Sequence, residues 1–82
     1  MAELNGKDPI ELDTEATGYR IRELMIEKQL SVKEICEKLN VSFQAVYKWQ
    51  RGENVPSITN LFILAQLLDV EVGEILVARK KK

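Results

Sequence analysis

Apolar residues recur every three or four positions along most of the chain, which is the spacing of amphipathic helices. The first such run begins after residue 13 and has its apolar positions on one face: Ile21, Leu24 and Met25. Asp13 or Thr14 is placed to cap this helix, and Glu15 falls in its first turn, where an acidic side chain is favoured. The pattern predicts a first helix that ends near Gln29.

A second and a third helix are expected in close succession. Ser31 and Glu34 have the spacing of a capping box, in which the two side chains satisfy backbone amides at a helix start. Asn40 tolerates a left-handed backbone and ends the second helix, whose apolar face is formed by Ile35, Cys36 and Leu39. Ser42 then caps a third helix that Gly52 ends. Because so few residues separate these two helices, they are expected to cross steeply, as in a helix-turn-helix.

Two more helices are expected in the remainder of the chain. Pro56 prevents an early restart, and Ser57 caps a fourth helix that runs to about Leu68. A short fifth helix is expected over residues 72–77. The prediction is therefore an all-α, compact five-helix fold with short loops.

The two ends of the chain lack a sustained apolar period. Residues 1–13 are expected to form an acidic N-terminal arm that is poorly ordered or draped on the body. Residues 79–82 are expected to form a solvated basic tail. One domain is therefore predicted, over residues 14–78.

The composition argues against catalysis. The chain has 82 residues, of which 45% are hydrophobic and 30% charged, so it is near the lower size limit for unaided folding. It has no histidine and one cysteine, and it therefore lacks the usual general bases, nucleophiles and metal ligands. Carboxylate chemistry is the remaining enzymatic alternative, but the carboxylates are scattered among lysines as on a solvated helix face. We expect no enzyme, no metal and no cofactor.

The same sequence indicates a cytoplasmic protein without a membrane partner. A single cysteine cannot form an internal disulfide. No segment resembles a signal peptide or reaches the ~20 apolar residues that span a bilayer.

The net charge of −1 hides an uneven distribution. Residues 1–15 contain five acidic side chains and one basic side chain, a net charge of −4, whereas residues 16–82 contain eleven basic and eight acidic side chains, a net charge of +3. Because the local field matters more than the total, the body has a mildly basic surface suited to nucleic acid. The acidic arm is unsuited to contact with phosphate.

Residues 31–52, SVKEICEKLNVSFQAVYKWQRG, resemble the Cro/CI-type, lambda-repressor-like helix-turn-helix family. The matching positions are the apolar Ile35, Leu39 and Val46, the small Cys36 between the helices, and the turn residue Asn40. The resemblance continues through W-x-R-G, P-S and LFILAQLLDVEVGEIL, and it covers residues 19–76. It implies a lambda-repressor-like domain with its helix-turn-helix at residues 31–51, and it implies sequence-specific binding of double-stranded DNA.

The third helix is the implied DNA-reading element, because the major groove admits one α-helix and displays a distinct pattern for each base pair. Its inward positions are Val46 and Trp49, and its outward positions, which the resemblance assigns to base reading, are Phe43, Gln44, Tyr47 and Lys48. Gln44 suits an adenine edge, Lys48 suits guanine, and Phe43 suits a thymine methyl. Tyr47 suits a base edge or a phosphate. For Phe43 and Tyr47 the alternative is partial packing in the core.

Phosphate contacts are expected around the helix-turn-helix: Ser31, Val32, Lys33, Ser42, Arg51 and Asn54. Lys38 is either a further contact or a solvated surface lysine. The chain departs from the family at Val32, where many members have a glutamine that bonds to the DNA backbone. It also has Met25 and Gln50 where many members pair arginine with glutamate, and this double change leaves no buried charge unpaired.

The fourth helix is apolar nearly all round, which predicts that both of its faces are covered. Its core-facing stripe is expected to be Ile58, Leu61, Phe62, Ala65 and Leu68. Ile63 and Leu67 are expected to project from the opposite face and to form the interface of a symmetric homodimer. Such a dimer would place two recognition helices about one DNA turn, roughly 34–36 Å, apart. The alternative is two scattered exposed residues, or contacts with the arm.

The leading hypothesis is a transcriptional regulator, most simply a repressor, that binds a two-fold-related operator as a homodimer. The alternative is an antitoxin or other protein-interaction module. Such a module would use the helix-turn-helix for autoregulation and would bind a second protein through the acidic arm or the fourth helix. The operator and the regulated genes are not encoded in these patterns.

Overall fold

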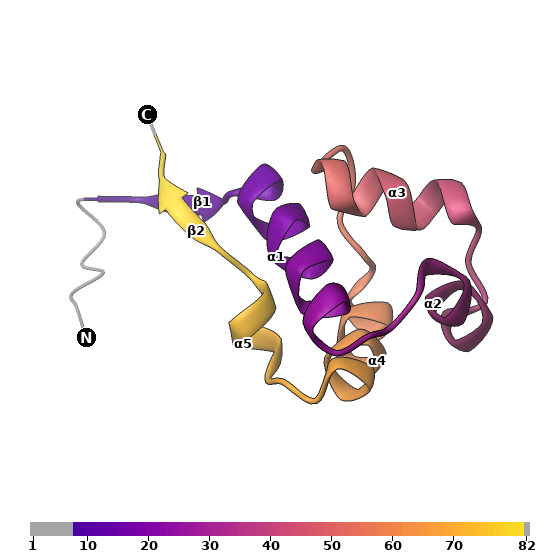
Figure 1. Ribbon diagram of the computed structural model, residues 1–82. Coiled ribbons are helices and arrows are strands. Elements are labelled where there is room, and N and C mark those ends of the chain that lie inside the picture. The colour runs from indigo at the N-terminus through magenta and orange to yellow at the C-terminus, as the bar shows by residue number, and fades with distance from the viewer. Residues whose placement is uncertain (1–7, 82) are drawn as a thin grey trace.

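The computed structural model describes residues 8–81, which form five α-helices and a short two-stranded antiparallel sheet (Figure 1). The elements are β1 (Ile10–Leu12), α1 (Thr14–Glu27), α2 (Val32–Leu39), α3 (Phe43–Arg51), α4 (Ile58–Leu68), α5 (Val72–Ile75) and β2 (Ala78–Lys80). The predicted all-α, five-helix class is confirmed, apart from this small sheet. No helix within the described residues is long and apolar enough to cross a membrane.

The predicted capping residues begin and end the helices. Asp13 caps α1 by accepting a 2.9 Å hydrogen bond from the Ala16 N–H. The capping box of α2 is present, and Ser42 and Ser57 each accept a hydrogen bond from the N–H three residues further on. Asn40 and Gly52, with φ of 56° and 77°, end α2 and α3 in the left-handed conformation. The turn between α2 and α3 is therefore set by local side-chain chemistry.

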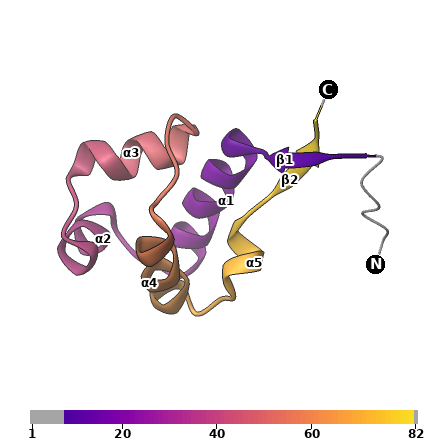
Figure 2. The same ribbon diagram turned by 180° about the vertical axis from the view of Figure 1, so that it is seen from behind.

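The core lies between the helices, with α1 packed along α3 (Figures 1 and 2). Every helix contributes at least one buried apolar side chain; the most completely buried are Ile21, Ile35, Val46, Leu64, Leu68 and Ile75. The inward positions predicted for α1 and α3 are confirmed, since Ile21, Leu24, Met25, Val46 and Trp49 are all buried. The shared core fixes α2 and α3 as one rigid unit.

Two glycines allow the end of α3 to rest directly on the start of α1. A Cβ at Gly18 would overlap the carbonyl oxygen of Trp49 and would lie 2.8 Å from that of Gln50. A Cβ at Gly52 would lie 2.7 Å from the Cα of Glu15, and the φ of 77° at Gly52 itself favours glycine. The position of α3 therefore depends on backbone-to-backbone contact with α1.

The structure buries a different face of α4 from the one that the sequence predicts. Ile58 and Phe62, which were expected in the core, are 74% and 63% exposed, whereas Leu64 is fully buried. Ile63 and Leu67 are half-buried and pack against the core, so they do not project from an opposite face. An almost wholly apolar helix offers several stripes with helical spacing and no polar face to choose among them. The assignment of Ile58 and Phe62 to the core is therefore wrong.

Residues at both ends of the domain form an antiparallel ribbon, which the sequence analysis did not foresee. In this ribbon β1 pairs with β2, with Glu11 opposite Arg79, and Glu11 Oε2 accepts a 2.8 Å hydrogen bond from Arg79 Nε. Residues 10–12, which were expected to be poorly ordered or draped on the body, form a strand instead. Residues 79 and 80 are exposed, as expected of a solvated tail, but they are paired in β2. Strands of three residues are too short to show an alternating pattern, and their partners are far apart in the sequence. The rest of the predicted arm, residues 1–7, lies outside the described residues, as does Lys82.

Backbone hydrogen bonds join the ribbon to α1. The Asp13 N–H donates to the Val77 carbonyl at 2.7 Å, and the Val77 N–H donates to Thr17 Oγ1 at 3.0 Å. Thr17 is completely buried, and its hydroxyl satisfies an amide that would otherwise lack a partner. α5 accordingly ends at Ile75, two residues earlier than expected, because the chain turns into β2.

Candidate nucleic-acid interface

The outward face of α3 presents the four predicted base-reading side chains together. Phe43 is 52% and Tyr47 is 46% exposed, and Gln44 and Lys48 are also exposed. About half of the surface of each aromatic residue is thus open to solvent and available for contact with DNA, and the remainder is covered, as the alternative of partial packing also expects. The exposed face combines an amide, a cation and two aromatic rings on one short helix. This combination offers donors, an acceptor and apolar surface to base edges.

The start of α2 presents backbone amides, but fewer than the sequence suggests. The first four N–H groups of a helix have no partner within the helix. In the capping box, the Ser31 N–H donates to Glu34 Oε1 at 2.8 Å and the Glu34 N–H donates to Ser31 Oγ at 3.1 Å. These bonds lower the pKa of Glu34. The N–H groups of Val32 and Lys33 remain for an anion, and the Ser31 N–H does not.

The side chain of Val32 is half-buried against the core. It therefore packs inward, and any contact with phosphate falls to its backbone N–H. The other departure from the family also has a structural counterpart, since Gln50 Nε2 donates to Met25 Sδ at 3.4 Å. A neutral pair therefore joins α1 and α3 here.

Ser42 and Asn54 lie at opposite ends of α3. The hydroxyl of Ser42 accepts from the Ala45 N–H at 3.0 Å and retains its own proton for donation. Asn54 is exposed in the loop after α3, where its N–H donates to the Lys48 carbonyl at 3.4 Å. The two residues therefore flank α3, one before its start and one after its end.

Arg51, at the end of α3, is held by an acidic neighbour that the sequence analysis missed. Its Nε donates to Glu53 Oε2 at 2.7 Å, and its Nη2 donates to Glu53 Oε1 at 3.3 Å. These hydrogen bonds raise the pKa of Arg51 and lower that of Glu53, so both groups are charged at neutral pH. A phosphate at Arg51 has to compete with Glu53. The sequence does contain a signal for this ion pair, which is an acidic residue two positions after the arginine.

We expect Glu53→Gln to strengthen DNA binding by freeing Arg51. Because an exposed ion pair contributes little to stability, the thermal unfolding midpoint should stay unchanged. The log–log dependence of affinity on salt should become steeper by up to about 0.9 for each protomer, the value for one added phosphate contact. Fluorescence anisotropy titrations at several salt concentrations measure this slope. Glu27→Gln, an exposed acid at the far end of α1, is the matched control; an equal gain there would show a general charge effect instead.

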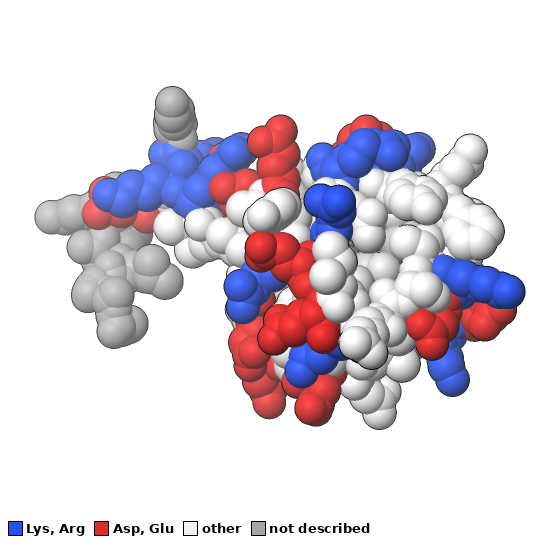
Figure 3. Space-filling model, in the orientation of Figure 1, with Lys and Arg blue, Asp and Glu red and all other residues white. Residues whose placement is uncertain are grey.

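Charge is distributed unevenly over the surface. On the face shown in Figure 3, lysine and arginine gather over the ribbon and over α3, whereas aspartate and glutamate gather over α5 and the adjoining part of α1. Within residues 8–81, no group of three or more histidine, cysteine or carboxylate residues is placed to hold a metal ion. The exposed face of α3 thus lies in the more basic part of this surface.

The helix α3 has an exposed polar and aromatic face, and a tight turn joins it to the capped helix α2. This arrangement defines a helix-turn-helix DNA-binding protein. A family model described as Helix-turn-helix matches residues 21–75, and the chain belongs to this Cro/CI-type family. It is accordingly a DNA-binding transcription regulator.

Solved structures of other regulators share this fold. The restriction-modification controller protein C.AhdI from Aeromonas hydrophila is 32% identical, with a TM-score of 0.69 over 77% of this chain and 96% of that one. The clp gene regulator ClgR from C. glutamicum is 24% identical, with a TM-score of 0.66 over 76% of this chain and 80% of that one. The DNA-binding domain of BldD is also 24% identical, with a TM-score of 0.64 over 78% of this chain and 93% of that one. A comparison with curated protein sequences gives no match.

Proposed function

We propose that the protein is a repressor that binds a two-fold-related operator as a homodimer in the cytoplasm, with one α3 in the major groove of each half-site. The observation that carries this proposal is the joint exposure of Phe43, Gln44, Tyr47 and Lys48 on α3. Their chemistry suits base reading, and occupancy of an operator is by itself enough to repress. The 32% identity with a restriction-modification controller supports a role in gene control.

In the proposed complex, phosphate contacts hold the register of α3. They come from the N–H groups of Val32 and Lys33, from Ser42 and Asn54, and from Arg51 after its release from Glu53. Helix N-termini and guanidinium groups are favourable partners of phosphate. Such contacts position the protein but carry no sequence information.

Selection of bound duplexes from a random DNA pool tests the proposal directly. We expect a two-fold-related motif with half-site centres about one DNA turn, roughly 34–36 Å, apart. Affinity for the selected site should fall steeply with salt, with a log–log slope of about −3.6 if four phosphates are neutralised. Equal affinity for every duplex, or a flat response to salt, would rule the proposal out.

Exposed apolar side chains on α4 support a homodimer, although its centre differs from the Ile63 and Leu67 that the sequence suggested. Ile58 and Phe62 lie one turn apart and are largely exposed, and a shallow hollow of about 510 Å³ adjoins Phe62. Ile63, Val70 and Val72 line this hollow. The exposed ring of Phe62 beside this hollow suits an isologous contact, in which each protomer contributes the same surface, ring and hollow together. We therefore place the centre of the interface at Ile58 and Phe62, with Ile63 in its floor.

Ile58→Glu combined with Phe62→Glu should leave the protein monomeric, because two charges would be buried in the interface without partners. The mass in solution, measured by light scattering, should halve, and the preference for a full site over a half-site should disappear. Ile26→Glu, an equally exposed apolar position on α1, is the control and should dimerise normally. A native chain that is monomeric at high concentration and on DNA would contradict this interface, as would a double variant that dimerises unchanged.

An antitoxin would bind its partner through the acidic arm or through α4, whose exposed apolar residues we assign above to the homodimer. Residues 10–12 of that arm are instead paired with β2. No contact among the described residues favours a second protein at this position, and we retain gene regulation as the proposed function.

A further inference from the structure

The ribbon lies along the same edge of the molecule as α3. In both Figure 1 and Figure 2, the ribbon and α3 run along the upper edge, whereas α4 and α5 lie below them. Gly52 at the end of α3 rests on Thr14 and Glu15, the first two residues of α1, which only Asp13 separates from β1. The longest dimension of the molecule is 42 Å, more than one turn of B-DNA at roughly 34–36 Å. A duplex that ran along this edge of the molecule would contact both α3 and the ribbon.

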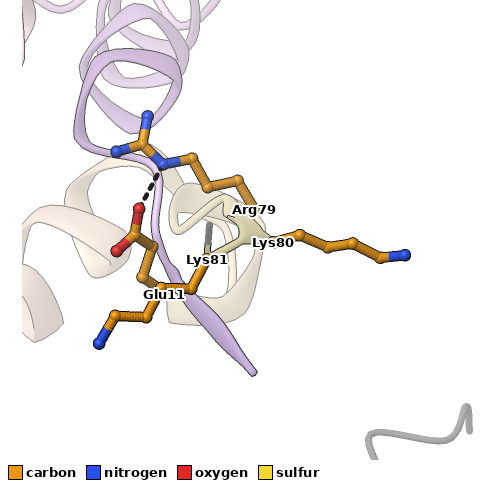
Figure 4. Close-up of a pocket in the computed structure, with 4 residues that line it drawn as sticks. All are labelled: Glu11, Arg79, Lys80 and Lys81. Atoms are coloured by element: carbon orange, nitrogen blue, oxygen red, sulfur yellow. Dashed lines mark hydrogen bonds and ion pairs between the residues drawn. The ribbon is translucent and has the colours of Figure 1, made fainter. Parts of the chain in front are cut away.

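The ribbon carries a run of basic residues of which the first is already paired. Arg79 donates to Glu11 at 2.8 Å, and this bond, with the nearby charges of Glu11, Asp13 and Glu15, raises its pKa. Lys80 and Lys81 are exposed, and neither forms an ion pair within residues 8–81. Figure 4 shows the Lys80 side chain extending away from the Glu11–Arg79 pair, and the Lys81 side chain extending to the other side of the ribbon, where Glu11 also lies. Each lysine thus presents a positive charge to solvent on its own side of the ribbon.

The backbone of these lysines is fixed in place. Lys80 pairs with Ile10 in the sheet, and the Lys81 N–H donates to the Pro9 carbonyl at 2.9 Å. The ribbon is itself bonded to α1 through Val77. A preorganised cation loses less conformational freedom on binding than one on a loose tail. The lysines therefore have a defined reach relative to α3.

We propose that Lys80 and Lys81 contact the phosphate backbone of DNA beside the half-site that α3 reads. This inference rests on the proposed function, and it extends the DNA-binding surface beyond the helix-turn-helix. The contact carries no base preference, because phosphates are the same in every sequence. It strengthens binding only where the duplex continues past the half-site.

The test uses the full chain and two duplexes that contain the selected site. The long duplex extends about one DNA turn, ~10 base pairs, beyond each half-site, and the short duplex stops at the half-site edges. Lys80→Ala with Lys81→Ala should reduce the steepness of the salt dependence on the long duplex by about 1.8 for each protomer, the value for two lost phosphate contacts. On the short duplex the double variant should match the native protein, and the selected motif should be unchanged on both.

Two controls separate the contact from other effects. Lys28→Ala removes an exposed lysine at the opposite end of α1 and should leave binding to the long duplex unchanged. Lys80→Arg with Lys81→Arg keeps both charges and should retain the native salt slope. An unchanged slope for the alanine variant on the long duplex would overturn the inference and would favour an acidic protein as the partner of these lysines. An equal loss on both duplexes would also overturn it, because that is the effect of net charge. If the native chain prefers no sequence, the proposed function itself fails.

Discussion

Gly18→Ala is expected to lower the free energy of unfolding by about 3 kcal/mol, the upper end of the usual cost of overpacking. The added methyl would meet the carbonyl groups of Trp49 and Gln50, which are backbone atoms and cannot rotate aside. α3 would have to move away from α1, which would disturb the core around Trp49. For a domain of this size, the loss corresponds to a fall in Tm of roughly 12–24 °C.

Gly73→Ala provides a matched control for this prediction. A Cβ at Gly73, within α5, would meet no atom within 4 Å. Because alanine is the better helix former, this change should be neutral or stabilising by about 0.5–1 kcal/mol. Urea unfolding followed by circular dichroism and by the fluorescence of Trp49 measures both variants. Similar stabilities for the two would show that α3 does not depend on close backbone contact at Gly18.

Gln44→Ala and Lys48→Ala should each cost roughly 1–3 kcal/mol of binding to the best site, or about 5-fold to 150-fold in Kd. Each change removes hydrogen bonds that discriminate one base pair, so the selected motif should lose its preference at one position. Arg51→Ala should instead weaken binding to all sequences nearly alike, because a phosphate contact carries no base information. Repeating the DNA selection with each variant separates the two patterns.

A specific outcome would show that α3 does not enter the major groove as proposed. If Gln44→Ala left both the selected motif and the affinity unchanged, another element would have to read the bases. All of these substitutions are at exposed positions, so unfolding midpoints should stay near that of the native chain. A loss of binding without a loss of stability is therefore attributable to the interface.

The helix boundaries were predictable because they depend on neighbouring residues. The hydroxyl of Ser31, the left-handed backbone of Asn40 and that of Gly52 act within one turn of their own positions. The outward face of α3 was predictable for the same reason, since the inward turn of Val46 and Trp49 fixes where Gln44 and Lys48 point. Local chemistry of this kind is readable from a sequence.

Features that depend on distant partners were not predictable. The rotation of α4 is decided by which of its many apolar residues fit against α2 and α5, and the sequence contains no polar face to reveal it. The close approach at Gly18 needs knowledge of where α3 lies. The bond between Arg51 and Glu53 is an exception, because it joins near neighbours and was visible as a spacing; its geometry depends on how the chain turns at Gly52.

The antiparallel pairing of β1 and β2 has a consequence for the order in which the chain folds. It joins residues such as Glu11 and Arg79, which are 68 positions apart, whereas the helices form from near neighbours. Closing so long a loop costs entropy that a few ribbon hydrogen bonds repay only after the helices have packed. We therefore expect the ribbon to pair only after the helices have packed. Hydrogen exchange should show its amides exchanging faster than those at the centre of α1, by brief local opening rather than global unfolding.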